Sequence, residues 1–371
     1  MECSTFNELE LGELSAVLLA QMKGRRYPLS GMFEVTERCN LSCVHCYINQ
    51  PASGQVACAK ELTTEQVKRI LDQAADAGCL YLTFTGGEPL LRPDFMEIYL
   101  HARKRGIIAS IFTNSTMVTP QIADGLAEVR PLFIEITLYG ATRETYEKVT
   151  RVPGSYERCL KGLELLKERG LPLFLKSALL TINRHELDEM KAFADKLGVK
   201  FRYDGQMWPR LDGSRQPLDY QFTPEEMFAI DCEDLERMRE IGRVSRELSG
   251  QIGRGMNLYT CGGGFHSFYI NAKGQLKSCG MIRWPAYDLQ EVSFNEAWEH
   301  LGETRSLKRQ KDSPCITCKM GALCQQCPAW SQAIHGDDET LVEFICQLAH
   351  LRSSQLNDSI IEISEEILTH G

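Results

Sequence analysis

The sequence predicts an α/β fold in which a partial (β/α)6 barrel is followed by a smaller cysteine-rich domain. Between residues 31 and 205, short apolar runs alternate with helix-forming segments, a pattern typical of parallel strands joined by helical crossovers. Ten of the 15 cysteines then fall into two spaced groups, one early and one late in the chain. Six strand–helix units are too few for a closed eight-stranded barrel, so we expect an open one.

The expected strands are the six apolar runs, which are Met32–Thr36, Leu80–Thr85, Ile107–Thr113, Phe133–Leu138, Leu173–Leu180 and Val199–Tyr203. The expected helices between them are Thr63–Ala77, Pro93–Arg105, Thr119–Glu128, Ser155–Arg169 and Glu186–Leu197. The first helix begins with a sequence that resembles a capping box, and glycine follows four of the five as a stop signal. Ligands of such sheets bind at the carboxyl ends of the strands, where the first cysteine group lies.

The chain divides into five expected segments. Residues 1–30 form an N-terminal helical extension with an amphipathic helix at Asn7–Lys23, and residues 31–205 form the barrel. Residues 206–257 supply a loop, a charged bridging helix at about Pro224–Leu248 and a linker at Gly250–Gly255. Residues 258–351 form the cysteine-rich domain, which opens with a hairpin at Phe268–Ser278. Residues 352–371 are expected to form a tail helix.

Composition narrows the class of protein. A net charge of −9 gives no electrostatic footprint for nucleic acid, and no run of 18 apolar residues predicts a membrane span. The N-terminus has no signal-peptide pattern, so we expect a cytoplasmic protein with reduced thiols. Clustered cysteines then indicate metal ligands or catalytic groups. The five scattered ones are expected to be small buried side chains, namely Cys3, Cys58, Cys79, Cys159 and Cys232.

The first cysteine group, Cys39, Cys43 and Cys46, has a spacing that requires a tight loop. Three thiolates can ligate three corners of a cubane iron–sulfur cluster and leave the fourth iron open to bind a small molecule and pass it an electron. The alternative is a structural zinc site, which needs four closed ligands. His45 lies within the loop as a fourth ligand, but its neighbours on both sides would crowd it.

These three cysteines and the following Tyr47 resemble the signature loop of the radical S-adenosylmethionine (SAM) enzymes, and Gly86-Gly87-Glu88-Pro89 resembles the GGEP motif of that family. The family's partial barrel agrees with the strand count. The resemblance implies that the open iron chelates the amino and carboxylate groups of SAM. Reduction, by a flavodoxin- or ferredoxin-type partner, then yields a 5′-deoxyadenosyl radical that removes hydrogen from a substrate.

The resemblance also suggests contacts for SAM. The methionine ammonium would meet the glycine turn and Glu88, and the adenine would lie near Tyr47. Asn114 and Thr137 would hydrogen-bond the ribose, and Arg151 would pair with the carboxylate. Each has an alternative, since Asn114 and Thr137 also suit a strand-end cap or a satisfied core position, and Arg151 suits a surface ion pair.

The second group comprises Cys261, Cys279, Cys315, Cys318, Cys324, Cys327 and Cys346. A zinc ribbon would leave three of the seven unexplained. The spacing resembles the SPASM domain, with two residues instead of the usual three between Cys324 and Cys327. The resemblance implies two auxiliary [4Fe–4S] clusters in addition to the SAM cluster, that is, three in all. Auxiliary cluster I takes Cys261, Cys279 and Cys327, with an iron that could be open, and auxiliary cluster II takes Cys315, Cys318, Cys324 and Cys346.

Two clusters in this position suggest an electron conduit, and the alternative is that they only hold the domain together.

Members of the family with this architecture mostly act on peptides or protein side chains. Sulfatase-maturing members have an acidic residue directly after the second SPASM cysteine, where this chain has Gly280, so that role is disfavoured. Only 38 residues precede Cys39, fewer than a leader-binding module needs, so we expect a separate, chaperone-like leader-binding protein.

The loop Tyr203–Gly213 leaves the sixth strand at the ligand face and is the candidate for substrate contacts, with Asp204 as the candidate catalytic base and Trp208 as a platform. The alternative is an ordinary capped loop.

The first functional hypothesis is a maturase that forms a carbon–carbon or thioether bond, epimerises a centre or excises backbone in a ribosomally made peptide. The second is a cofactor-biosynthesis enzyme acting on a small or heme-like molecule, and the third is a non-catalytic electron carrier.

Overall fold

The computed structural model describes residues 17, 24–48, 50–247, 256–310, 312–320 and 323–355. The expected helix at Asn7–Lys23 lies outside these residues apart from Val17, and the expected linker at Gly250–Gly255 and tail residues 356–371 lie outside them entirely. No helix within the described ranges is long and apolar enough to cross a membrane.

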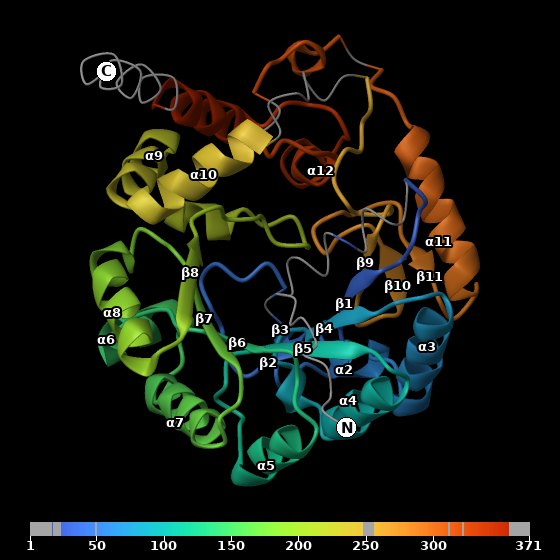
Figure 1. Cartoon of the computed structure of the whole chain (residues 1–371), viewed down its shortest axis with the longest axis vertical. Helices are drawn as coiled ribbons and strands as arrows, with labels where there is room; N and C mark the ends of the chain where they lie inside the picture. Colours follow the sequence, from blue (N-terminus) through green and yellow to red (C-terminus); the bar gives the residue numbers. More distant parts are fainter. Residues whose placement is uncertain are drawn as a thin grey trace, which may run out of the picture.

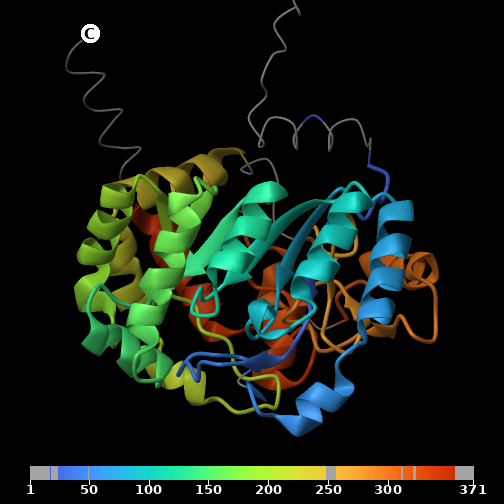
Figure 2. The same cartoon turned by 90° about the horizontal axis from the view of Figure 1, so that it is seen from below.

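The expected open barrel is confirmed. Six strands pair in parallel in the order β1-β4-β5-β6-β7-β8, and β8 ends the sheet. Helices ring their outer side (Figure 1), and the cyan to green helices lie side by side across that face when seen from below (Figure 2). The strands are β1 (Ser30–Glu34), β4 (Tyr81–Thr85), β5 (Ile108–Thr113), β6 (Ile134–Thr137), β7 (Leu173–Ala178) and β8 (Lys200–Asp204).

The outer helices bury apolar stripes against the sheet, and they begin and end where the sequence indicates. They are α3 (Thr64–Asp76), α4 (Phe95–Lys104), α5 (Pro120–Glu128), α7 (Ser155–Glu168) and α8 (Leu187–Leu197). Thr63 and Gln66 form a reciprocal capping box at the start of α3. Between sheet and helices lies a core that includes fully buried Phe84, Ile111 and Leu175. Burying side chains of this size contributes about 1.5–3 kcal/mol each.

Shorter elements that the sequence did not predict complete the barrel's ligand face. They are α6 (Arg143–Thr150), α2 (Gln55–Lys60) and the two-stranded pair β2 (Arg38–Cys39) and β3 (Gln50–Pro51). The expectation of small buried cysteines is confirmed for Cys79 and Cys159. It is wrong for Cys58, which is exposed because α2 buries only Ala57, and Cys232 is half-buried, whereas Cys3 lies outside the described residues.

The bridging segment differs from the single charged helix that we expected. It forms two helices, α9 (Pro224–Glu233) and α10 (Leu235–Glu247), separated at Asp234. The Asp234 backbone is not helical, and its carboxylate accepts the Arg237 backbone N–H at 3.0 Å. Asp234 therefore caps the start of α10, a role for which aspartate is strongly preferred.

The C-terminal part continues the barrel sheet. The predicted hairpin is confirmed as β9 (Ser267–Ile270) and β10 (Gln275–Lys277), with the Asn271 side chain accepting two turn N–H groups and Gly274 at φ +81°. β9 pairs in parallel with β1, and β11 (Tyr287–Asp288) extends the edge. Around them lie α11 (Phe294–Glu303), α12 (Pro328–His335) and helical residues 343–355. The sequence predicted the hairpin but not its pairing with the barrel.

Candidate functional site

The first cysteine group lies in the loop after β1, at the carboxyl ends of the barrel strands. The loop is held by α6, because the Ser42 and Val44 N–H groups donate to the carbonyls of Thr150 and Val149, each at 3.0 Å. Terminal carbonyls of a helix have no partner within the helix, so the cysteine loop satisfies them. The unexpected α6 thereby fixes the backbone around Cys43.

The three thiols of this loop lie close enough to affect one another's ionisation. Burial is the main cause that raises the pKa of Cys39, to about 12, and the charges of Glu88 and Cys46 add to it. Burial also raises the pKa of Cys43 well above its usual value, and the thiolates of Cys46 and Cys39 add to that shift. The Leu41 backbone N–H donates to Cys39 Sγ at 3.4 Å, and the Asn114 amide approaches the same sulfur at 3.8 Å. Buried, converging sulfurs that receive N–H donors fit an iron–sulfur cluster, whose iron would keep them deprotonated.

The glycine turn after β4 packs directly on the chain that leads into the cysteine loop. The Gly87 N–H donates to Thr36 O at 2.7 Å and the Glu88 N–H to Arg38 O at 2.9 Å. A Cβ on Gly87 would lie 2.2 Å from Arg38 O, closer than any side chain tolerates. We expected these glycines to let a ligand approach, and their observed contact is with the cysteine loop itself.

The Glu88 carboxylate lies in the interior and is fully used there. It is 0% exposed and accepts from the Leu90 N–H, the Thr113 hydroxyl and the Asn114 N–H, at 2.7–3.0 Å. Burial raises its pKa to about 7, although these three hydrogen bonds oppose the shift.

The other expected SAM contacts lie around this loop in varied environments. The Asn114 side chain is saturated, since its oxygen accepts from Thr116 and its amide donates to Asn40. Thr137 ends β6 half-buried, beside the buried Tyr139. Arg151 is exposed at the end of α6 and donates to the Tyr220 hydroxyl at 3.2 Å.

The two residues that flank Cys46 face different partners. His45 is half-buried and lies edge-on to Tyr139. Its buried Nδ1 has no partner among the described residues, and desolvation lowers the pKa of the ring to about 4. The Tyr47 carbonyl accepts the Leu211 N–H at 2.9 Å, and burial raises the pKa of the Tyr47 hydroxyl well above its usual value. Within the described ranges, no three His, Cys, Asp or Glu side chains are placed to hold a single metal ion.

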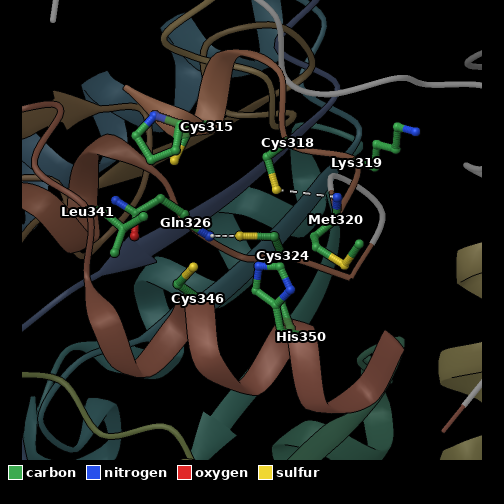
Figure 3. Close-up of a pocket in the computed structure, with 11 residues that line it drawn as sticks. Cys315, Cys318, Lys319, Met320, Cys324, Gln326, Leu341, Cys346 and His350 are labelled. Atoms are coloured by element: carbon green, nitrogen blue, oxygen red, sulfur yellow. Dashed lines mark hydrogen bonds between the residues drawn. The ribbon is translucent and has the colours of Figure 1, made fainter. Parts of the chain in front are cut away.

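The cysteines of the second group lie in two neighbourhoods. Burial raises the pKa of Cys327 to about 11 and also raises the pKa of Cys279, and a thiolate at Cys261 adds to both shifts, which places these three sulfurs near one another. Four others line one cavity of about 290 Å³ (Figure 3), namely Cys315, Cys318, Cys324 and Cys346. The Met320 and Gln326 N–H groups donate to the Cys318 and Cys324 sulfurs at 3.4 Å, which again fits cluster ligation.

The substrate-contact candidates after β8 lie apart from one another. Asp204 is exposed, and its carboxylate accepts the Gln206 N–H at 3.0 Å, as in an ordinary capped loop. Trp208 is not an open platform, because its ring stacks on Trp330 of α12 with centroids 3.5 Å apart. The pair packs against Cys324 and Cys327, so Trp208 belongs to the apolar packing between the two sets of cysteines. The sequence carried no signal for Trp330 as its partner.

Residues 33–197 match the Radical SAM superfamily. The chain is 27% identical over 325 residues to the AdoMet-dependent heme synthase of Methanosarcina barkeri (strain Fusaro / DSM 804), across 82% of this chain and 92% of that protein. It is also 27% identical over 321 residues to the Mycofactocin maturase MftC of Mycolicibacterium smegmatis (strain ATCC 700084 / mc(2)155), across 82% and 78%.

Two solved structures share the fold. anSMEcpe with bound AdoMet and Cp18Cys peptide superposes with a TM-score of 0.66 at 18% identity, covering 92% of this chain and 99% of that one. Streptococcus suis SuiB bound to precursor peptide SuiA superposes with a TM-score of 0.63 at 16% identity, covering 89% and 81%. At these low sequence identities, the likeness shows a shared fold and no more.

Proposed function

The chain is a radical SAM enzyme that uses SAM and a [4Fe–4S] cluster, and on that premise we propose that it is a maturase of a ribosomally made peptide. The modification would be a carbon–carbon or thioether cross-link, an epimerisation or a backbone excision. Because the chain is an enzyme, the hypothesis of a non-catalytic electron carrier no longer applies.

The observation that carries the proposal is an open groove of about 1370 Å³ beside the last barrel strand. Its lining comes from β8, α8 and α10, and it reaches Gln325, next to Cys324, and Arg352. Charged and polar side chains dominate it, among them Lys200, Arg239 and Glu236. An extended peptide, with its polar backbone and mixed side chains, suits such a groove.

In this proposal Cys39, Cys43 and Cys46 hold the SAM cluster, and the two later sets hold auxiliary clusters I and II. When bound there, the SAM cluster would supply the electron for the reductive cleavage of SAM. The chain's own residues position this chemistry. Gly86 and Gly87 fix the cysteine loop, Asn114 donates toward Cys39, and Tyr47 lies next to the last ligand. A leader-binding protein and a flavodoxin- or ferredoxin-type reductant complete the proposed system.

A second candidate, a tetrapyrrole-modifying enzyme, is favoured by four relatives, three heme synthases and an Fe-coproporphyrin III synthase; this chain covers 92% of the length of one of the heme synthases. Co-expression with short peptides encoded beside this protein, followed by mass spectrometry, distinguishes the two. A maturase changes the peptide's mass, or incorporates solvent deuterium if it epimerises. An unchanged peptide together with conversion of an added iron–coproporphyrin would replace the first proposal by the second.

A further inference from the structure

The barrel sheet has two edges, and among the described residues only one of them is covered by another strand. At the first edge, β9 of the C-terminal hairpin pairs with β1 along residues 30–33. At the second edge, β8 is the last strand of the sheet, and no further described strand pairs with it. The unpaired backbone of an edge strand is a template for another extended chain, so proteins usually protect it. The open edge of β8 therefore requires an explanation.

Two hydrogen bonds identify the backbone groups of β8 that face this edge. The Asp204 carbonyl accepts the Leu179 N–H at 2.8 Å, so the backbone groups of Asp204 point toward β7. Backbone groups alternate between the two sides of a strand, so those of Tyr203 and Phe201 point away from β7. Arg237 of α10 agrees with this assignment, because its guanidinium donates to the Tyr203 carbonyl at 3.1 Å. Within the described ranges, the N–H and carbonyl of Phe201 and the N–H of Tyr203 have no partner on that side.

A groove of about 1370 Å³ lies along the open edge. All five residues of β8 line it, together with residues of α10, which lies beside β8 (Figure 1). The groove extends beyond the carboxyl end of the strand to Gln206. The same loop continues to Leu211, whose N–H donates to the carbonyl of Tyr47 in the cysteine loop. Space beside unpaired backbone therefore leads toward the face of the barrel that holds the first cysteine group.

The side chains of this groove favour an acidic partner. Seven of its lining residues are lysine or arginine and five are aspartate or glutamate, although the whole chain has a net charge of −9. Five of the seven cations already pair with carboxylates, as Arg202 does with the buried Glu135. Lys200 and Arg239 are exposed and have no ion-pair partner among the described residues. These two cations can form charge-assisted hydrogen bonds with carboxylates of a bound chain.

We propose that an extended, acidic segment of the peptide substrate binds as an additional strand against the outer edge of β8. The inference rests on the proposed function and states how this chain holds its substrate. Main-chain hydrogen bonds to Phe201 and Tyr203 supply affinity, and carboxylates that face Lys200 and Arg239 select the segment. Because β8 runs toward the ligand face of the barrel, one end of the bound segment lies toward the cysteine loop.

The test is a binding measurement by fluorescence anisotropy on the full chain, prepared anaerobically. The probe is a labelled eight-residue peptide of alternating threonine and glutamate, blocked at both ends, which presents all its carboxylates on one face when extended. Its matched partner carries an N-methyl group on every residue. We expect the N-methylated peptide to bind about tenfold more weakly, because the Phe201 carbonyl loses its donor and the methyl groups prevent close approach. A peptide of alternating threonine and lysine should bind more weakly still.

Variants of the chain test the charge contacts and the position of the probe. Lys200→Glu should weaken probe binding about threefold to tenfold, because it places like charges opposite each other. Lys161→Glu is the matched control, since Lys161 is exposed on α7 and does not line the groove, and it should bind the probe as the wild type does. Hydrogen–deuterium exchange should slow at residues 200–204 when the probe is bound.

Each of four results would overturn the proposal. They are no binding at about 1 mM probe, equal binding of the N-methylated peptide, equal affinities in Lys200→Glu and Lys161→Glu, and unchanged exchange at residues 200–204. The outcome is separate from that of the co-expression experiment. A neighbouring peptide that is modified without protecting residues 200–204 would refute the docking site alone. Probe binding along β8 with every neighbouring peptide left unmodified would keep the docking site and refute the maturase proposal.

Discussion

Replacing Gly87 by alanine tests the contact between the glycine turn and the cysteine loop. The new Cβ would lie 2.2 Å from Arg38 O, and ordinary contact begins at 3.4 Å, so the two loops must separate by 3.4 − 2.2 = 1.2 Å. Overpacking of this kind costs about 1–3 kcal/mol. The hydrogen bonds from Gly87 and Glu88 to the cysteine loop would also weaken.

The displaced peptide of Arg38 leads directly into Cys39, so the variant should affect the chemistry more than the fold. A shift of about 1 Å in a reacting group costs about 100-fold in rate. We therefore expect the rate of SAM cleavage in Gly87→Ala to fall about 100-fold, with a lower iron content and a melting temperature reduced by several degrees. The assays are 5′-deoxyadenosine release, iron and sulfide analysis, and anaerobic thermal unfolding.

Gly125→Ala is the matched control, because Gly125 lies within α5 and its Cβ would meet only the flexible end of Met96, at 3.1 Å. Alanine is favoured over glycine inside a helix by about 1 kcal/mol, so this control should cleave SAM at the wild-type rate. Wild-type cleavage by Gly87→Ala would refute the argument that this contact positions the cysteine loop.

Three further predictions concern other parts of the chain. The pKa of Glu88 is about 7 in the folded state and about 4.5 in the unfolded state, so the free energy of unfolding decreases as pH rises between these two values. This pKa difference of 2.5 corresponds to a loss of at most about 3 kcal/mol. Urea unfolding at pH 5 and 8 should show a smaller difference in Glu88→Gln, and an equal difference would contradict the assignment. Asp234→Ala removes the cap of α10 and the ion pair with Lys191, and should lower the unfolding free energy by about 1–2 kcal/mol; wild-type stability would exclude the capping role. Cys43→Ala should abolish SAM cleavage, whereas Cys324→Ala should reduce product more than cleavage, and equal losses would make the second domain mainly structural.

The sequence predicted the barrel well because its signals are local. Apolar runs such as Tyr81–Thr85 and the capping residue Thr63 act within a few positions. What it could not predict depends on contacts between distant segments. The pairing of β9 with β1 joins residues more than 230 positions apart, and Glu34 and Tyr269 meet only through it. Trp208 suggested a binding platform because nothing near it in sequence indicated the stack on Trp330.

The role of Asn114 could not be predicted from the sequence either. Its position at the end of β5 suits a ribose contact, but the structure uses its side chain to join Asn40 and Thr116 and to approach Cys39. The position of Asn114 in the sequence is compatible both with a ribose contact and with a structural role. Only the partners brought together by folding distinguish them.

The central claim is that three separate sets of cysteines each hold an iron–sulfur cluster. Iron and sulfide analysis with Mössbauer spectroscopy, on anaerobically prepared protein, tests it most directly. The account predicts about twelve iron atoms per chain, and about four fewer after simultaneous replacement of Cys39, Cys43 and Cys46 by alanine. Zinc in place of iron, or an iron content unchanged by that replacement, would contradict it.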